Sequence, residues 1–331
     1  MAYASSGKAS PVTTASGQGA GGSAPGSVRV IDFMRWRVVA VCTSLILVLG
    51  SVVSLGINGL NLGLDFTGGT LVELSYDKPV DIAGLRTQLE EQGYADVMVQ
   101  EFGSTRDVLI RVPGGSSGMN PGDKISQLLT DSYAGTLTVN RIEFIGPQVG
   151  EQLRDQGGLG MLLALVLVML YIAFRFQFKF SLGAVVALTH DSIVVLGFFS
   201  LFRLTFDLTV LAALLAVIGY SLNDTIIVYD RVRENFRKLR RSSLEEIIDV
   251  SLSQTLGRTL ATSGTTMMVL LALYFLGGDA IKGFSLALLV GVGIGTYSSI
   301  YIASAMLVHA KLRREDLIPP DAANSAADDK N

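Results

Sequence analysis

Six long apolar segments limit what this chain can fold into. They lie at residues 38–57, 159–174, 182–201, 208–229, 256–276 and 284–308. Apolar runs of about 20 residues are long enough to cross the hydrocarbon core of a bilayer as a helix. Apolar residues make up 49% of the 331-residue chain, and charged residues only 17%. We therefore expect a multi-pass α-helical membrane protein with six transmembrane helices.

The first apolar segment follows Arg35 and Arg37, as the core of a secretory signal would. Its apolar stretch is about 20 residues long, whereas a signal core has about 7–15, and no Ala-x-Ala cleavage site follows it. The sequence therefore predicts a retained membrane anchor at residues 38–57.

Basic residues gather in alternate connections between the apolar segments. They are Arg29, Arg35, Arg37, Arg175, Lys179, Arg231, Arg233, Arg237, Lys238, Arg240, Arg241, Lys311, Arg313 and Arg314. The positive-inside rule places these connections and both chain ends in the cytoplasm. Residues 230–250 then form a basic cytoplasmic loop with a short helix, and residues 58–155 lie on the external side. The terminal stretches 1–28 and 309–331 are predicted to be disordered tails, because their small and polar side chains bury little apolar surface.

Residues 58–155 have the pattern of one small α+β domain. Strands are expected at 70–76, 96–102, 107–112 and 137–145, and helices at 82–92 and 121–133. This β-α-β-β-α-β order is typical of a ferredoxin-like fold. The glycine-rich stretch 114–118 lacks the Lys of a phosphate-binding loop. The segment also contains no histidine, so we expect a binding or lever module, not an enzyme.

Asp224 interrupts the fourth apolar segment. Together with Asn223 it lies about 16 residues, or about 24 Å, from the outer end of that segment. Arg258 lies at a similar depth in the fifth segment, so a hairpin of the two helices would bring the charges together. An ionised carboxylate in hydrocarbon costs roughly 2.5–3.5 kcal/mol and marks a candidate proton or ion pathway. Two interpretations stay open: a proton carrier, or a structural ion pair of Asp224 with Arg258.

Polar side chains recur at three- and four-residue steps along one face of the fifth segment. They are Thr255, Arg258, Thr262 and Thr265, and Ser263 and Thr266 flank this face. Such hydroxyls either line a wet proton path or hold neighbouring helices together.

His190 and Asp191 are adjacent in the middle of the third segment. A histidine beside an acid can relay protons. Successive helix positions point about 100° apart, so the two side chains cannot face the same neighbour. The alternative is a structural pair that ties helices together.

The sixth segment carries small residues at four-residue spacing. They are Gly291, Gly295, Ser299 and Ala303. Small residues let membrane helices approach closely, so this stripe predicts a packing surface.

Several long motifs are similar to those of the bacterial SecF family. They are residues 63–69 (Gly-Leu-Asp-Phe-Thr-Gly-Gly), 146–150 (Gly-Pro-Gln-Val-Gly), 190–191, 220–235 and 251–266. The motifs occur in order and at matching topological positions, and the resemblance covers about residues 30–312.

The resemblance implies an inner-membrane subunit that pairs with SecD in a complex of the resistance–nodulation–division superfamily. Such a complex uses the proton-motive force to assist export through the SecYEG channel by movement of its external domain, and a YajC-type small subunit is a further possible partner. Protons are then the coupling ion, and no cofactor or metal is expected. The proton carrier maps onto Asp224 and its basic partner onto Arg258. We expect hinges near Asp65, Gly68, Gly69, Gly146 and Pro147.

Other functions are compatible with part of the pattern. A half-unit of a proton-driven exporter from the same superfamily would also have six spans and a buried acid. A purely structural subunit is disfavoured, because buried charges are costly to keep. An enzyme is disfavoured, because neither a nucleophile–base set nor a metal-binding set is visible. The single cysteine, Cys42, excludes a disulfide framework.

Overall fold

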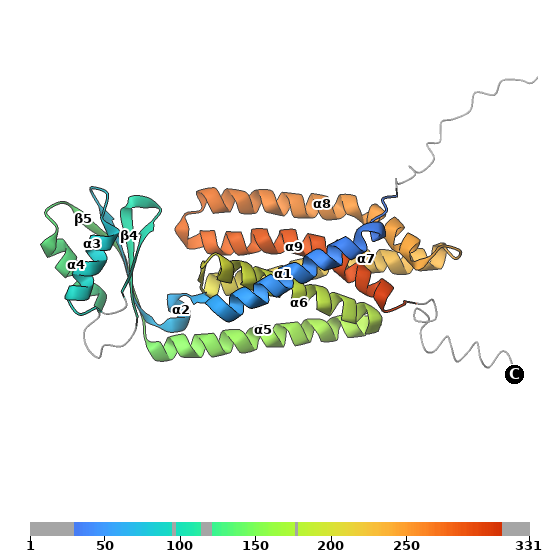
Figure 1. Ribbon diagram of the computed structural model, residues 1–331, viewed down its shortest axis with the longest axis horizontal. Coiled ribbons are helices and arrows are strands. Elements are labelled where there is room, and N and C mark those ends of the chain that lie inside the picture. The colour runs from blue at the N-terminus through green and yellow to red at the C-terminus, as the bar shows by residue number, and fades with distance from the viewer. Residues whose placement is uncertain (1–29, 95–96, 114–120, 176–177, 313–331) are drawn as a thin grey trace, which may run out of the picture.

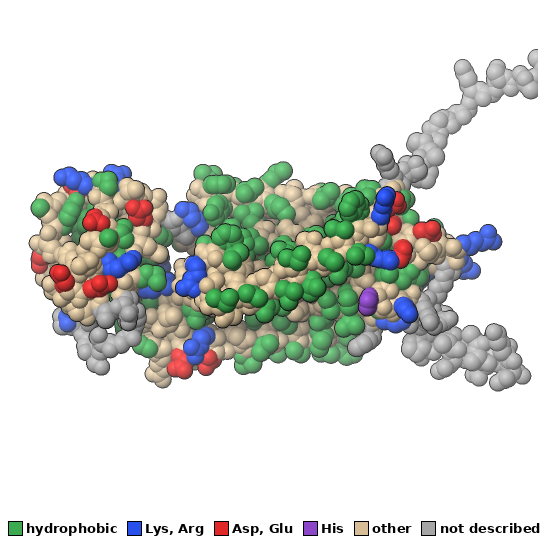
Figure 2. Space-filling view, in the orientation of Figure 1, with side chains coloured by type: hydrophobic (Ala, Val, Ile, Leu, Met, Phe, Trp, Pro, Cys, Tyr) green, Lys and Arg blue, Asp and Glu red, His purple; other side chains and the backbone are tan. Residues whose placement is uncertain are grey.

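A computed structural model describes residues 30–94, 97–113, 121–175 and 178–312. It consists of a bundle of long helices with a small α/β domain at one end (Figure 1). The space-filling view shows apolar side chains over the bundle, and acidic and basic side chains toward its two ends (Figure 2). The predicted tail 1–28, residues 313–331 of the second tail, and the glycine-rich stretch 114–118 lie outside the described residues.

Six helices in the described part are long and apolar enough to cross a membrane, as predicted. They are α1 (Arg37–Asn58), α5 (Pro147–Arg175), α6 (Phe178–Leu201), α7 (Leu208–Lys238), α8 (Leu244–Leu276) and α9 (Asp279–His309). A single 3-10 turn, η1 (Met34–Trp36), leads into α1. The apolar stretches of α6 and α7 are 61% and 50% buried, against 17% for α8 and 6% for α5. The centre of the bundle is therefore built from α6, α7 and α9, and α5 and α8 are peripheral.

The prediction of a cytoplasmic loop over residues 230–250 made that loop too long. Helix α7 continues through Lys238 and α8 begins at Leu244, which leaves a loop of only 239–243. Val232 and Phe236 keep one face of the α7 extension buried. Ser243 forms a capping box with Glu246 at the start of α8, which satisfies free N–H groups of its first turn.

Helix α5 also begins earlier than the sequence predicted. Its first residue is Pro147, so the α/β domain ends near Ile145, not at residue 155. The early start agrees with the preference of proline for the first turn of a helix.

The α/β domain has the predicted β-α-β-β-α-β order. Its elements are β2 (Gly69–Tyr76), α3 (Ile82–Glu91), β3 (Met98–Phe102), β4 (Ser104–Pro113), α4 (Pro121–Ser132) and β5 (Leu137–Ile145). The strands form an antiparallel sheet in the order β3-β4-β2-β5, which is the ferredoxin-like arrangement. Leu89 of α3 and Ile125 of α4 share one buried core with Leu74 and Ile110 of the sheet. Both helices therefore cover the same face.

Two short elements connect this domain to the bundle. Strand β1 (Asn61–Leu62) pairs in parallel with β6 (Thr205–Phe206), which lies between α6 and α7. Helix α2 (Leu64–Thr67) follows β1 directly. The chain leaving α1 is thereby fastened to the start of α7 before it enters the sheet.

The small residues of α9 lie against α7. A Cβ atom added at Gly291 would overlap the side chain of Val217, and one at Gly295 would meet Ser221 Cβ at 3.0 Å. The two backbones approach this closely only because α9 carries no side chain at these positions.

We expect Gly291→Ala to destabilise the protein by about 1–3 kcal/mol, because the stiff Val217 side chain cannot move aside without strain. The matched control is Gly219→Ala on α7, where an added Cβ meets nothing within 4 Å. That change should be neutral or stabilising by up to about 1 kcal/mol. Thermal unfolding of the purified chain in detergent measures both, and equal midpoints for the two variants would contradict the packing argument.

Candidate functional site

Asp191 of α6 lies at the centre of a buried polar cluster. Its Oδ2 accepts hydrogen bonds from Ser221 Oγ of α7 at 2.6 Å and from Ser298 Oγ of α9 at 2.8 Å. Its Oδ1 lies 3.0 Å from His190 Nδ1. The carboxylate therefore joins the three central helices, and its own polar atoms are satisfied.

His190 also contacts α9, although the helical spacing predicted that the two side chains could not face the same neighbour; the two meet adjacent α9 residues, Tyr297 and Ser298. Its ring lies beside Tyr297, with centroids 6.4 Å apart, and Tyr297 Oη donates to Ala40 O of α1 at 2.7 Å. Within the described part of the chain, the buried Nε2 atom of His190 has no hydrogen-bond partner. In this pair, the Asp191 carboxylate has its hydrogen-bond partners, whereas the His190 Nε2 atom, on the side of α1, has none among the described residues.

Asp224 lies on α7, three residues after Ser221. It is fully buried, and neither carboxylate oxygen has a hydrogen-bond partner among the described residues. Ser263 and Arg258 of α8 both lie near enough to influence this carboxylate. The Ser263 hydroxyl also lies 2.8 Å from Thr296 Oγ1 of α9. A buried acid without a partner is costly, and this one is the least satisfied charged group in the described bundle.

The expected ion pair between Asp224 and Arg258 is not formed in this structure. Arg258 is exposed, and so is Asn223. The face of α8 that meets the bundle carries Thr255, Thr259 and Ser263. Equal depth in the membrane does not fix the direction in which a side chain leaves its helix, and Arg258 lies beside that buried face.

The predicted threonines of α8 bond mainly to their own helix. Thr262 Oγ1 donates to Arg258 O at 3.1 Å, and Thr265 Oγ1 donates to Ala261 O at 2.8 Å. Thr266 is half-buried. Such back-bonding satisfies a hydroxyl without joining helices, whereas Ser263 does join α8 to α9 through Thr296.

The stripe on α9 continues its contact with α7 through polar groups. Ser299 Oγ lies 2.8 Å from Thr225 Oγ1, and Tyr229 Oη donates to Ala303 O at 3.2 Å. These contacts extend the close approach that begins at Gly291 and Gly295. The sequence did not single out Ser221 or Ser298 as partners of Asp191. The four-residue step from Ser221 to Thr225, on either side of Asp224, was the available signal.

Asp65 connects the α/β domain to the helix that carries Asp224. Its Oδ2 accepts from the backbone N–H of Leu208, the first residue of α7, at 2.9 Å. Asp207 caps the same helix end by accepting from Val210 N at 2.9 Å. Two carboxylates at a helix N-terminus are favourable, because that end carries a partial positive charge.

Arg111 of β4 reaches the same junction. Its Nη1 donates to Leu62 O of β1 at 3.1 Å. Burial lowers the pKa of Arg111, and the negative charges of Asp207 and Asp65 partly offset that effect. The half-buried guanidinium therefore bonds the sheet to β1 and interacts through charge with Asp207 at the start of α7.

The predicted hinge residues lie where both ends of the domain meet the bundle. Gly68 and Gly69 have φ of +67° and +125°, conformations that favour glycine. A Cβ at Gly68 would meet Pro147 Cα at 2.7 Å, whereas one at Gly146 meets nothing within 4 Å. The connections entering β2 and leaving β5 thus touch each other closely at Gly68 and Pro147.

Removing a single hydroxyl tests the cluster around Asp191. We expect Ser298→Ala to destabilise the protein by about 1–2 kcal/mol, because a buried carboxylate loses a charge-assisted donor. The control is Ser304→Ala in the same helix, since Ser304 is equally buried and its hydroxyl makes only a 3.5 Å contact with Ser299 O. Thermal unfolding in detergent compares them, and an equal loss would argue that Asp191 gains nothing from Ser298.

Asp65→Ala tests the junction. The loss of a cap on α7 should cost about 1 kcal/mol and should increase amide hydrogen exchange at the start of α7. Asp155→Ala is the control, because Asp155 is exposed on α5 and, among the described residues, forms an ion pair only with its neighbour Arg154, at 3.4 Å. Unchanged exchange at residues 208–211 in the Asp65 variant would show that the contact does not hold this helix end.

Comparison with known proteins shows which family has this architecture. Residues 124–313 match the family model "Protein export membrane protein SecD/SecF, C-terminal", and residues 53–80 match the SecD/SecF GG motif. The chain is 54% identical over 302 residues to protein translocase subunit SecF of Pseudomonas aeruginosa, covering 91% of this chain and 98% of that one. It is 46% identical to the corresponding subunit of Vibrio alginolyticus, covering 91% and 96%.

Two solved structures share the fold. SecDF of Thermus thermophilus is 36% identical with a TM-score of 0.79, over 86% of this chain and 39% of that one. A SecDF in a super-membrane-facing form is 35% identical with a TM-score of 0.65, over 91% and 40%. The chain therefore spans about two fifths of these SecDF chains and nearly the whole of the SecF relatives.

Proposed function

The chain belongs to the SecF family of protein translocase subunits, and we propose that it pairs with SecD in a complex that uses the proton-motive force to assist protein export. The coverage supports the pairing, because this chain matches only about two fifths of chains that hold SecD and SecF together. Two related six-helix halves are a common plan for proton-driven transporters. The proposed downstream partner is the SecYEG channel, with the unfolded secreted polypeptide as substrate.

The buried, unbonded carboxylate of Asp224 is the observation that carries the proton-coupling proposal. Its ionised form is costly at this depth. Either a proton on the carboxylate or the approach of the Arg258 guanidinium would remove that cost. The exposed position of Arg258 leaves room for both states, one with the two groups apart and one with them paired.

Movement in the bundle has a direct route to the α/β domain. Asp224 and the Asp65-capped N-terminus belong to one continuous helix, α7. A proton crossing 100 mV supplies about 2.3 kcal/mol, which is enough to shift two helix packings of nearly equal free energy. In this proposal, protonation moves α7, Asp65 transmits the movement, and the domain bends at Gly68, Gly69 and the 146–147 connection.

The proposed location is the bacterial inner membrane, with both chain ends in the cytoplasm and the α/β domain outside. Basic residues at the end of the bundle away from that domain support this orientation. The proposed work is mechanical, so it requires no covalent step and no cofactor, and protons are the coupling ion.

Asp224→Asn is the decisive variant. The amide resembles the protonated acid in shape but cannot release a proton, so we expect the loss of gradient-dependent secretion. Export of a presecretory protein is measured in cells that carry only the variant, with and without an uncoupler. The variant should export slowly, and the uncoupler should add little further loss at this step.

Asp230→Asn provides the matched control on the same helix. Asp230 is exposed and lies 3.5 Å from Arg175, so its neutralisation should leave export near the parent level. Thermal unfolding of both variants separates lost coupling from lost folding. Parent-like, uncoupler-sensitive export by the Asp224 variant would refute the assignment and leave Asp224 a structural group.

A further inference from the structure

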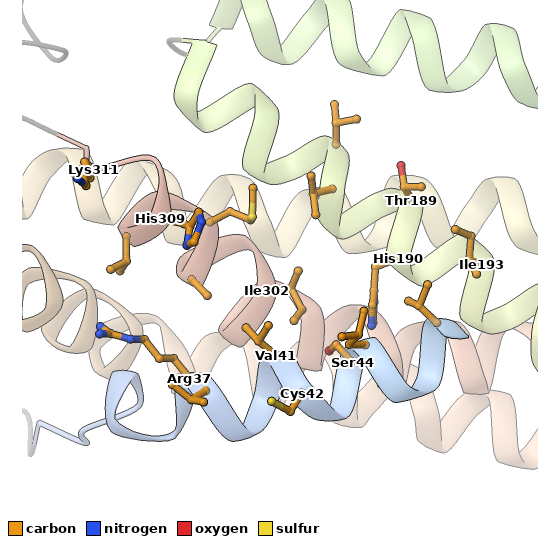
Figure 3. A pocket seen from close by; sticks show the side chains of 18 residues that line it. Arg37, Val41, Cys42, Ser44, Thr189, His190, Ile193, Ile302, His309 and Lys311 are labelled. Carbon is orange, nitrogen blue, oxygen red and sulfur yellow. The ribbon is translucent and has the colours of Figure 1, made fainter. Parts of the chain in front are cut away.

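An apolar groove lies between α1, α6 and α9 (Figure 3). Its volume is about 870 Å³, and its walls include Val41 and Leu45 of α1, Val186 and Ile193 of α6, and Ile302 of α9. All three helices are membrane-spanning candidates, so the groove would open to the bilayer and not to water.

The charges of this groove are confined to one end. Arg37, His309 and Lys311 line it there, and Ile193 lies toward the other end (Figure 3). Among the described residues, no Asp or Glu lines the groove. A groove with cationic side chains at one end and apolar walls along its length complements an amphiphile that has one anionic end.

The length of the groove matches one membrane leaflet. On α1 the lining residues run from Arg37 to Val48, which is about 16 Å at 1.5 Å per residue. The hydrocarbon core of a bilayer is about 30 Å thick, so a leaflet contributes about 15 Å. We propose that the groove binds one anionic phospholipid of the leaflet near the chain ends, with its phosphate at Arg37 and Lys311 and an acyl chain along α1.

Arg37 can serve this rim although it already has a partner. Its Nη1 pairs with Glu245 of α8, and both side chains are partly exposed. A guanidinium has five N–H donors, so others stay available for phosphate oxygens. Exposed ion pairs are also weak, so a phosphate competes readily with Glu245.

The inner wall of the groove links the lipid to the polar cluster. His190 points into the groove near Ser44 (Figure 3), and its other ring nitrogen contacts Asp191. An acyl chain in the groove covers this edge of the histidine and keeps water from reaching the pair from the α1 side.

Native mass spectrometry of the purified full-length chain in detergent tests the site. Dioleoylphosphatidylglycerol and dioleoylphosphatidylcholine are titrated separately. Near a membrane surface each cation adds about fivefold to the binding of an anionic lipid, thus about 25-fold for two. We expect the anionic phosphatidylglycerol to bind about 25-fold more tightly than the zwitterionic phosphatidylcholine. The double variant Arg37→Gln/Lys311→Gln should abolish this difference in affinity. Arg240→Gln/Arg241→Gln, an equal charge change in the loop 239–243, should preserve it.

A second pair of variants tests the acyl channel without changing charge. Val41→Trp fills the groove and should remove the tight site, whereas Val52→Trp should not. Val52 is similarly exposed on α1 but does not line the groove. Thermal unfolding confirms that each variant is folded.

Five results would overturn the proposal. One is equal binding of the two lipids. Another is equal loss in both double-charge variants, which would indicate general surface attraction. Tight binding of sn-glycerol 3-phosphate alone, or lipid binding that survives Val41→Trp, would place the phosphate at the rim with no chain in the groove. A dimer that Val41→Trp disrupts would place a second copy of the protein there.

Discussion

A bilayer interior offers no water to a buried polar group, and the arrangement of this bundle depends on that constraint. The Asp191 carboxylate has protein partners in place of water, since hydroxyls from α7 and α9 and the ring of His190 contact its oxygens. The Asp224 carboxylate has no such hydrogen-bond partners among the described residues, although it lies three residues from Ser221 on the same helix. The contrast between the two acids separates a carboxylate that joins three helices from one that has no hydrogen-bond partner among the described residues, and the proposed coupling rests on the second.

Helix α7 connects most of the features on which the proposed function depends. One end is capped by Asp65 at the junction with the α/β domain, its middle carries Asp224, and its length packs on the small residues of α9. A helix that is tightly packed along its length transmits displacement to its end, because its backbone hydrogen bonds resist local deformation. The hydrogen bond of Arg111 to Leu62 extends this connection to the sheet of the α/β domain.

The periphery of the bundle has a different character. Helices α1, α5 and α8 expose long apolar faces, with Leu260 and Phe275 on α8 as examples. Such faces are suited to lipid or to a partner subunit. The groove beside α1 differs from them because charge is confined to one end, and this asymmetry is the basis of the proposed lipid site.

The sequence by itself determined the six spanning helices and the ferredoxin-like domain, because apolar length and hydrophobic period follow directly from residue order. It also located Asp224 and His190-Asp191 at membrane depth. Only the tertiary structure decided the partners. Arg258 shares the depth of Asp224 but is exposed, since side-chain direction depends on how each helix is rotated against its neighbours. The extension of α7 through Lys238 and the groove beside α1 were likewise set by packing between segments distant in the chain.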